Sequence, residues 1–149
     1  MLPGYDYDFE MTIRFDEEFS QSVRRELVES FITKLPGVAS GRTMTGDKGF
    51  VLDSSGRRMD IVLESRRWDG KVGERVEERE LVNCVHLTIP ASARGPEKER
   101  DYFLLAFTIA EHLGWHVHDD TDSGDWVSKD SLNAMFPTQE KPKPWWKRW

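Results

Sequence analysis

The sequence predicts an α+β fold, a ferredoxin-like sandwich with an antiparallel sheet of about five strands, two helices on one face and a short C-terminal helix. Two observations predict it. Apolar and polar residues alternate in several segments, as in half-buried strands, and apolar residues recur every three to four positions in two longer segments, as in amphipathic helices. The order is strand, helix, three strands, helix, strand, which leaves one face of the sheet to water or to a partner.

The N-terminal part predicts a strand and then a helix. Residues 5–15, YDYDFEMTIRF, alternate between apolar and polar side chains over the whole segment, which is typical of a strand with one buried face. An amphipathic helix is predicted over residues 16–35, ended by Pro36 and Gly37. Its apolar stripe consists of Phe19, Val23, Leu27, Phe31 and Leu35, widened by Val28 and Ile32.

The middle of the chain predicts a hairpin and a further strand. Residues 39–49, ASGRTMTGDKG, are rich in glycine and are expected to form an irregular connection. Strands are predicted over 50–53 and 58–66, with a turn at 54–56. Residues 68–80 are charged and indicate a loop or a strand extension. The segment LVNCVHLTIPA indicates a strand that Pro90 ends.

The C-terminal part predicts a buried helix, a short strand and a last helix. Pro96 suits the first turn of the buried helix, and Gly114 suits its C-terminal cap. WHVHD indicates a strand, TDSGD a turn, and VSKDSLNAMF a short helix capped by Ser128. The expected organisation is one domain over residues 1–136 and a loose Pro/Trp/Lys-rich tail over 137–149.

The composition favours a cytoplasmic protein without a transmembrane segment. The chain has 149 residues, of which 38% are hydrophobic and 32% charged. It contains no apolar run of about 18 residues, and MLPGYDYDFE does not resemble a secretory signal. Cys84 is the only cysteine, which excludes an intrachain disulfide and favours a reducing compartment.

Charge is unevenly distributed along the chain. The whole chain has a net charge of −6. Four cations and one carboxylate give the tail +3, so residues 1–136 together carry −9. An acidic body disfavours duplex DNA and suits a basic protein partner. The candidate partner-binding carboxylates are Asp6, Asp8, Glu10, Glu77, Glu78 and Glu80.

The tail itself is a second candidate binding element. Trp145, Trp146 and Trp149 alternate with lysine and arginine in KPKPWWKRW. Such a segment can stack on single-stranded nucleic acid, insert into an anionic membrane surface or dock in a groove of another protein. It can also fold back over an apolar patch of its own domain, because three free tryptophans favour aggregation.

A histidine- and aspartate-rich segment, EHLGWHVHDDTDSGD, raises the possibility of a metal site. His116 and His118 share one strand face, and with His86 and Asp119 they could surround a metal ion and support a metal-dependent enzyme. The turn also resembles part of a calcium loop, although its carboxylates are too few. Two exposed strand histidines and a solvated turn are the favoured interpretation, so no cofactor and no catalytic residue are expected.

One segment resembles a known group of proteins. FLLAFTIAEHLGWHVHDDTDSGDWV is similar to the closing helix, LGW and strand of small uncharacterised bacterial α+β proteins, some of them immunity proteins that bind and neutralise a toxin. The resemblance implies a binding role and identifies no catalytic residue. The leading hypothesis is therefore a non-catalytic cytoplasmic protein-binding module, with an immunity-type inhibitor of a toxin as a special case. The alternatives are the metal-dependent enzyme and an accessory protein that acts on nucleic acid or membranes through its tail.

Overall fold

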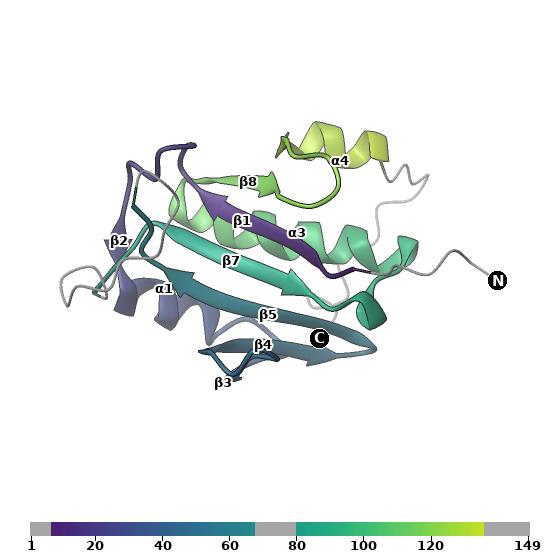
Figure 1. Ribbon diagram of the computed structural model, residues 1–149, viewed down its shortest axis with the longest axis horizontal. Helices are drawn as coiled ribbons and strands as arrows, with labels where there is room; N and C mark the ends of the chain where they lie inside the picture. Colours follow the sequence, from purple (N-terminus) through teal and green to yellow (C-terminus); the bar gives the residue numbers. More distant parts are fainter. Residues whose placement is uncertain (1–6, 68–79, 136–149) are drawn as a thin grey trace.

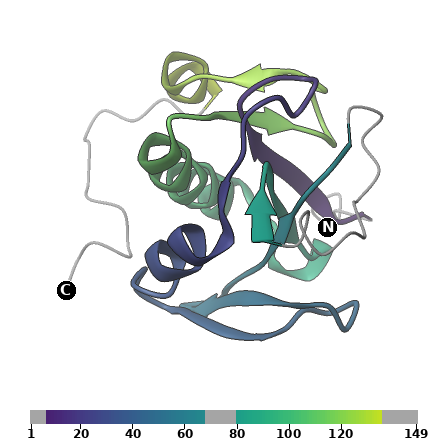
Figure 2. The same cartoon turned by 90° about the vertical axis from the view of Figure 1, so that its left-hand side faces the viewer.

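The computed structural model describes residues 7–67 and 80–135, which form a sheet covered on one face by helices (Figures 1 and 2). The large sheet contains β1 (Phe9–Arg14), β3 (Val38–Arg42), β4 (Lys48–Ser54), β5 (Arg57–Glu64), β7 (Cys84–Ile89), β8 (His116–Asp119) and β9 (Trp126–Val127). Its strand order is β3-β4-β5-β7-β1-β8-β9, and every neighbouring pair is antiparallel. A separate ribbon pairs β2 (Val23–Arg24) with β6 (Leu81–Val82).

Two helices, α1 (Arg25–Ile32) and α3 (Pro96–Leu113), lie on the same face of the sheet, whereas α4 (Lys129–Met135) lies at its β8 end (Figures 1 and 2). A short 3-10 helix, Ala91–Ala93, precedes α3. The core fills the space between the two layers. It contains Met11 and Ile13 of β1, Leu87 of β7 and Ile109 of α3, all fully buried.

The predicted α+β class is confirmed, but the sheet has seven strands rather than about five. One additional strand comes from the glycine-rich segment expected to be irregular, where β3 pairs with β4 from Val38↔Leu52 to Arg42↔Lys48. The turn between them is closed by hydrogen bonds from the Thr43 amide to the Asp47 carbonyl and from the Gly46 amide to the Thr43 carbonyl. The Asp60 carboxylate of β5 also accepts a hydrogen bond from the Met44 amide at 2.9 Å. A small residue such as Gly41 has little strand propensity, so tertiary pairing decided the structure here.

The predicted helix over 16–35 is the largest error, since only Arg25–Ile32 is helical. The Asp16 carboxylate accepts hydrogen bonds from the amides of Glu18 and Ser20, which holds this stretch in a turn. Phe19 then adopts a left-handed φ of 56°. As a result the buried face of α1 consists of Val28 and Ile32, while Leu27 is 59% exposed.

The remaining predicted elements are close to those found. The β4–β5 hairpin turns at Ser55 and Gly56, both with positive φ, as in a two-residue type I′ turn. Helix α3 begins at Pro96 and ends at Leu113, and Gly114 caps it in the left-handed conformation. The Ser128 hydroxyl accepts a hydrogen bond from the Ser131 amide at the start of α4. Within the described ranges, no helix has both the length and the apolar character needed to cross a membrane.

Candidate functional site

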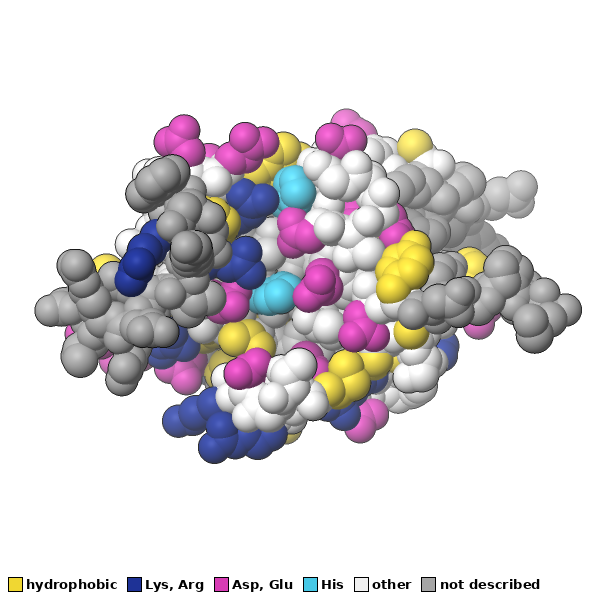
Figure 3. Space-filling model, in the orientation of Figure 1, with side chains coloured by type: hydrophobic (Ala, Val, Ile, Leu, Met, Phe, Trp, Pro, Cys, Tyr) yellow, Lys and Arg dark blue, Asp and Glu magenta, His cyan; other side chains and the backbone are white. Residues whose placement is uncertain are grey.

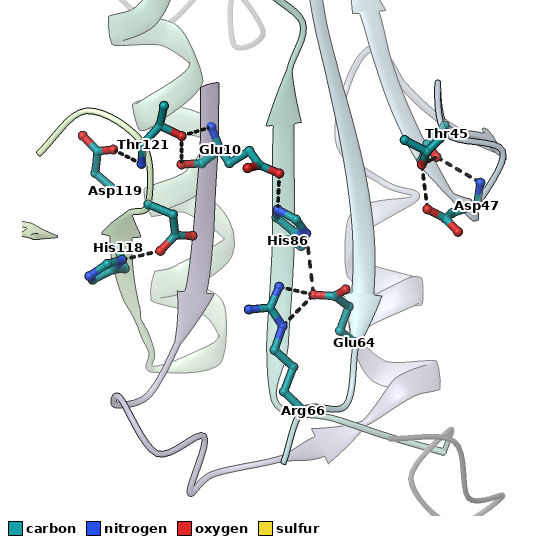
Figure 4. A network of polar contacts seen from close by, with 11 residues as sticks. Glu10, Thr45, Asp47, Glu64, Arg66, His86, His118, Asp119 and Thr121 are labelled. Atoms are coloured by element: carbon teal, nitrogen blue, oxygen red, sulfur yellow. Dashed lines mark hydrogen bonds and ion pairs between the residues drawn. The ribbon is translucent and has the colours of Figure 1, made fainter. Parts of the chain in front are cut away.

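The sheet face without helices, here called the open face, carries a connected set of charges (Figures 3 and 4). Nε2 of His86 lies 3.1 Å from the Glu10 carboxylate, and its Nδ1 lies 3.7 Å from Glu64. Arg66 binds the same Glu64 carboxylate through two nitrogens, at 2.9 and 2.6 Å. The carboxylates of the open face are thus partly neutralised within the protein.

Arg14 is the buried cation of this face. Its guanidinium lies between the rings of Phe19 and Trp126, 4.9 Å from each centroid, and donates hydrogen bonds to the Thr12 hydroxyl and the Asp16 carbonyl. No described carboxylate forms an ion pair with it. Both rings are within cation–π distance of the guanidinium, so Arg14 connects Phe19 to Trp126.

Cys84 lies on β7 next to this cluster and is fully buried. Burial raises the pKa of its thiol to about 12, with Arg66 acting in the opposite direction. The thiol is therefore protonated at neutral pH. Because nucleophilic attack requires the thiolate, Cys84 acts here as a small packed side chain.

The four candidate metal ligands are spread over the sheet. His86 lies on β7, and His116 and His118 lie on β8, with β1 between the two strands. His118 bonds Asp120 through Nδ1. In residues 7–67 and 80–135, no group of three or more His, Cys, Asp or Glu side chains could hold a metal ion. The metal-site hypothesis stays a prediction without support from these contacts.

The Asp119 carboxylate is used by the turn that follows β8. Its Oδ1 accepts hydrogen bonds from the amides of Thr121 and Asp122, and its Oδ2 accepts from the amide and hydroxyl of Ser123. The Asp122 carboxylate in turn accepts from Arg94 and from the Tyr7 hydroxyl. These carboxylates thus already accept hydrogen bonds from protein donors, and the calcium-loop interpretation stays a prediction.

Three of the predicted partner-binding residues are described. Asp8 accepts a hydrogen bond from the Ala91 amide at 3.0 Å, Glu10 contacts His86, and Glu80 is exposed beside β6. The others lie outside the described residues: Asp6, Glu77, Glu78, Trp145, Trp146 and Trp149. These partner-binding assignments stay predictions.

The sequence reasoning missed a groove of about 730 Å³ at the β8 end of the molecule, here called the end groove. Its apolar lining comes from three separate segments: Phe15; Phe107, Ala110, Trp115 and Val117; and Trp126 and Val127. Phe15 and Trp126 are 40% and 37% exposed. Their rings flank His116, whose centroid is 6.2 Å from each. The groove thus has two exposed aromatic walls over an apolar floor.

The rim of the end groove is acidic. It carries Asp16, Glu17, Glu18 and Glu111, with Lys129 as the one rim cation among the lining residues. Lys129 is paired with Glu111. Hydrogen bonds from the Ser20 side chain and backbone lower the pKa of Asp16, so this carboxyl stays ionised well into the acidic range. Glu17 and Glu18 form no ion pair with any described residue and are the charges open to a ligand.

Parts of the end groove can be recognised in the sequence only once the structure is known. The acidic run DEE follows directly on Phe15, and Trp126 follows a turn, but nothing in the spacing joins two segments more than a hundred positions apart. The comparisons with known proteins do not help, since no family model, curated protein or solved structure matches the chain. The end groove is therefore identified as a candidate site by its geometry alone.

Proposed function

We propose that the protein is a non-catalytic binding module that holds a basic and apolar segment of another protein in the end groove. The observation that carries this proposal is the combination of an apolar floor, two exposed aromatic walls and unpaired rim carboxylates in one groove. Exposed aromatic surface of this kind marks interaction sites, and aromatic residues dominate binding energy at protein interfaces.

The rigidity of the groove supports this role. The Arg14 guanidinium lies over the Trp126 ring, and the rings of Trp126 and His118 meet edge to face with their centroids 5.0 Å apart. Asp16 holds the opposite rim in a hydrogen-bonded turn with Ser20. A groove whose walls are already ordered loses little conformational entropy when a partner binds.

The charges define the partner. Glu17 and Glu18 extend the acidic character of the body, −9 over residues 1–136 once the tail is set aside, to the edge of the apolar floor. A segment with an apolar side chain for the floor and lysine or arginine for the rim is complementary to both. An immunity-type inhibitor in the cytoplasm is the special case in which this partner is a toxin.

Affinity capture with matched variants tests the proposal. The full chain is compared with Glu17→Gln/Glu18→Gln and with a control, Asp53→Asn/Glu97→Gln. The control also removes two negative charges, but from exposed positions that do not line the groove. Partners are captured from cells that express the gene and quantified by mass spectrometry. Tryptophan-to-serine changes at 145 and 146, in the full chain, separate a tail-mediated interaction from a groove-mediated one.

We expect the control and the tail variant to capture the partner at least as well as the unchanged chain does. The amount captured by the groove variant should fall at least about tenfold, which corresponds to about 1.4 kcal/mol of binding free energy. Equal capture by the groove variant and the control would contradict the proposal. Loss only in the tail variant would favour the accessory role of the tail instead.

We also propose that the central four strands form the ferredoxin-like arrangement. Their order, β8-β1-β7-β5, and the positions of α1 after β1 and α3 after β7 support it, because the repeated βαβ halves of that fold interleave in this way. The β3–β4 strands and β9 are then additions at the two edges. An experimental structure with a different order of these four strands would contradict this assignment.

A further inference from the structure

The end groove lies beside the last element of the chain that the structure describes. Ser128 and Lys129, at the start of α4, line the groove, and α4 lies at the β8 end of the sheet (Figure 1). The described part of the chain stops with this helix, and residues 136–149 follow it. The point from which these residues continue is therefore separated from the groove by one short helix.

The chain beyond α4 is long enough to return to the groove. Helix α4 has 7 residues, which makes it about 10 Å long at a rise of 1.5 Å per residue. An extended chain covers about 3.3 to 3.6 Å per residue, so residues 136–141 span up to about 20 Å. Residues 141–149 are thus within reach of the groove lining.

The lining of the end groove and this segment have opposite charges. Glu111 and Lys129 neutralise each other, which leaves Asp16, Glu17 and Glu18 with −3 on the rim. Residues 137–149 carry +3. Glu17 and Glu18 are exposed and form no ion pair with a described residue, so they can pair with the cations of the segment, Lys141, Lys143, Lys147 and Arg148.

The apolar side chains of the segment also match the groove. Trp145, Trp146 and Trp149 stand among the cations in KPKPWWKRW, and the groove has an apolar floor of about 730 Å³ between two exposed aromatic walls. That volume is typical of sites that enclose a ligand larger than one side chain. Aromatic rings also attract one another beyond the effect of the area they bury. Tryptophan side chains of the segment thus find matching surface in the groove.

We infer that residues 141–149 of the chain itself dock in the end groove, with tryptophan on the apolar floor and cations beside Glu17 and Glu18. The short connection gives the segment an effective concentration on the order of 1 mM at the groove. A segment with millimolar affinity then fills the groove in about half of the molecules. A partner must displace it, so the partner's apparent affinity falls about twofold or more; this last step rests on the function proposed above.

A spin label on the tail tests the docking in the purified full chain. The label is attached to Trp149→Cys, because the native Cys84 is fully buried. Nuclear magnetic resonance then measures which amide signals the label weakens. We expect weaker signals for Val117 and Val127, which line the groove. The signal of Ser40 should not change, because β3 is the edge strand at the opposite side of the sheet.

Matched charge variants show whether the groove causes the effect. Glu17→Gln/Glu18→Gln and added salt should each reduce the weakening, because both diminish the attraction between rim and segment. Asp53→Asn/Glu97→Gln removes two charges away from the groove and should leave the weakening unchanged. Unchanged lining signals in the labelled chain, or equal weakening in the groove variant and the control, would overturn the inference. Weakening that appears only between different molecules of a mixed sample would assign the groove to the tail of a second copy and would also overturn it.

Affinity capture tests the displacement step separately. Trp145→Ser/Trp146→Ser removes apolar side chains of the segment but keeps its cations, so it should capture at least about twofold more partner than the unchanged chain. Equal or lower capture would overturn the displacement step. If none of the chains captures a partner, the proposed function fails, whereas the docking is still decided by the spin-label result in the purified chain.

Discussion

Replacing Asp119 by alanine removes one buried carboxylate on which the turn after β8 depends. Asp119 is 4% exposed, and its oxygens accept four hydrogen bonds at 2.9 to 3.2 Å, three from amides and one from the Ser123 hydroxyl. The same residue is a candidate metal ligand in the sequence. The substitution therefore distinguishes a residue that orders a turn from one that holds an ion.

The size of the effect follows from these contacts. A hydrogen bond to a charged group contributes about 1.5 to 3 kcal/mol, but Ser123 and Gly124 are exposed, so water replaces part of what is lost. We expect the free energy of unfolding to fall by about 2 to 4 kcal/mol. For a chain of this length that lowers the melting temperature by about 4 to 16 °C.

Urea denaturation followed by circular dichroism measures this change. Ser123→Ala is the graded control, because it removes one donor to Asp119 together with the acceptor of the exposed Asp125 amide, and it is expected to cost about 1 kcal/mol. Each variant is measured in chelator and again with calcium or zinc. A loss below about 0.5 kcal/mol for Asp119→Ala, or a loss that appears only when metal is present, would refute the reasoning.

Three further predictions follow from single residues. Cys84 should not react with a thiol reagent at pH 8 in the native protein, because its pKa is about 12, and should react once urea unfolds the chain; rapid native labelling would contradict this. The pKa of Asp16 should lie below 3.8, so the stability it contributes is present above its unfolded pKa and is lost as the pH falls through the lower folded one. In Ser20→Ala a nuclear magnetic resonance titration should find that pKa nearer 3.8, and an unchanged value would exclude the Ser20 bond as its cause. Leu87→Ala, at a fully buried position, should cost about 2 to 5 kcal/mol, whereas Leu81→Ala, at a position 41% exposed, should cost less than about 1 kcal/mol in the same urea series.

Local sequence patterns correctly predicted the elements whose conformation depends mainly on neighbouring residues in the chain. The alternation in β1 correctly placed Met11 and Ile13 in the core, and Pro96 and Gly114 marked the ends of α3. The helix over 16–35 failed because a side chain competes with the helix for backbone amides. Asp16 bonds two of those amides, and Val23 pairs with Val82 of a distant ribbon, which periodicity does not reveal.

The candidate sites were less predictable than the fold. Thr12 and Arg14 are buried on the polar side of β1, where Phe19, before β2, and Trp126 of β9 lie against the Arg14 guanidinium. The end groove needs residues from three segments, and β3 pairs with β4 in a stretch that has low strand propensity. In each case long-range packing brings the residues together, and a single sequence carries no record of it.

Photocrosslinking from two positions tests the end groove most directly. A photoreactive phenylalanine analogue is placed at Phe15, 40% exposed in the groove wall, or at Leu27, 59% exposed on α1 and not part of the groove. The proposal predicts that position 15 crosslinks to a partner protein within a segment that contains lysine or arginine, while position 27 gives little product. Equal crosslinking from both positions, or none from position 15 in cells where the partner is captured, would contradict it.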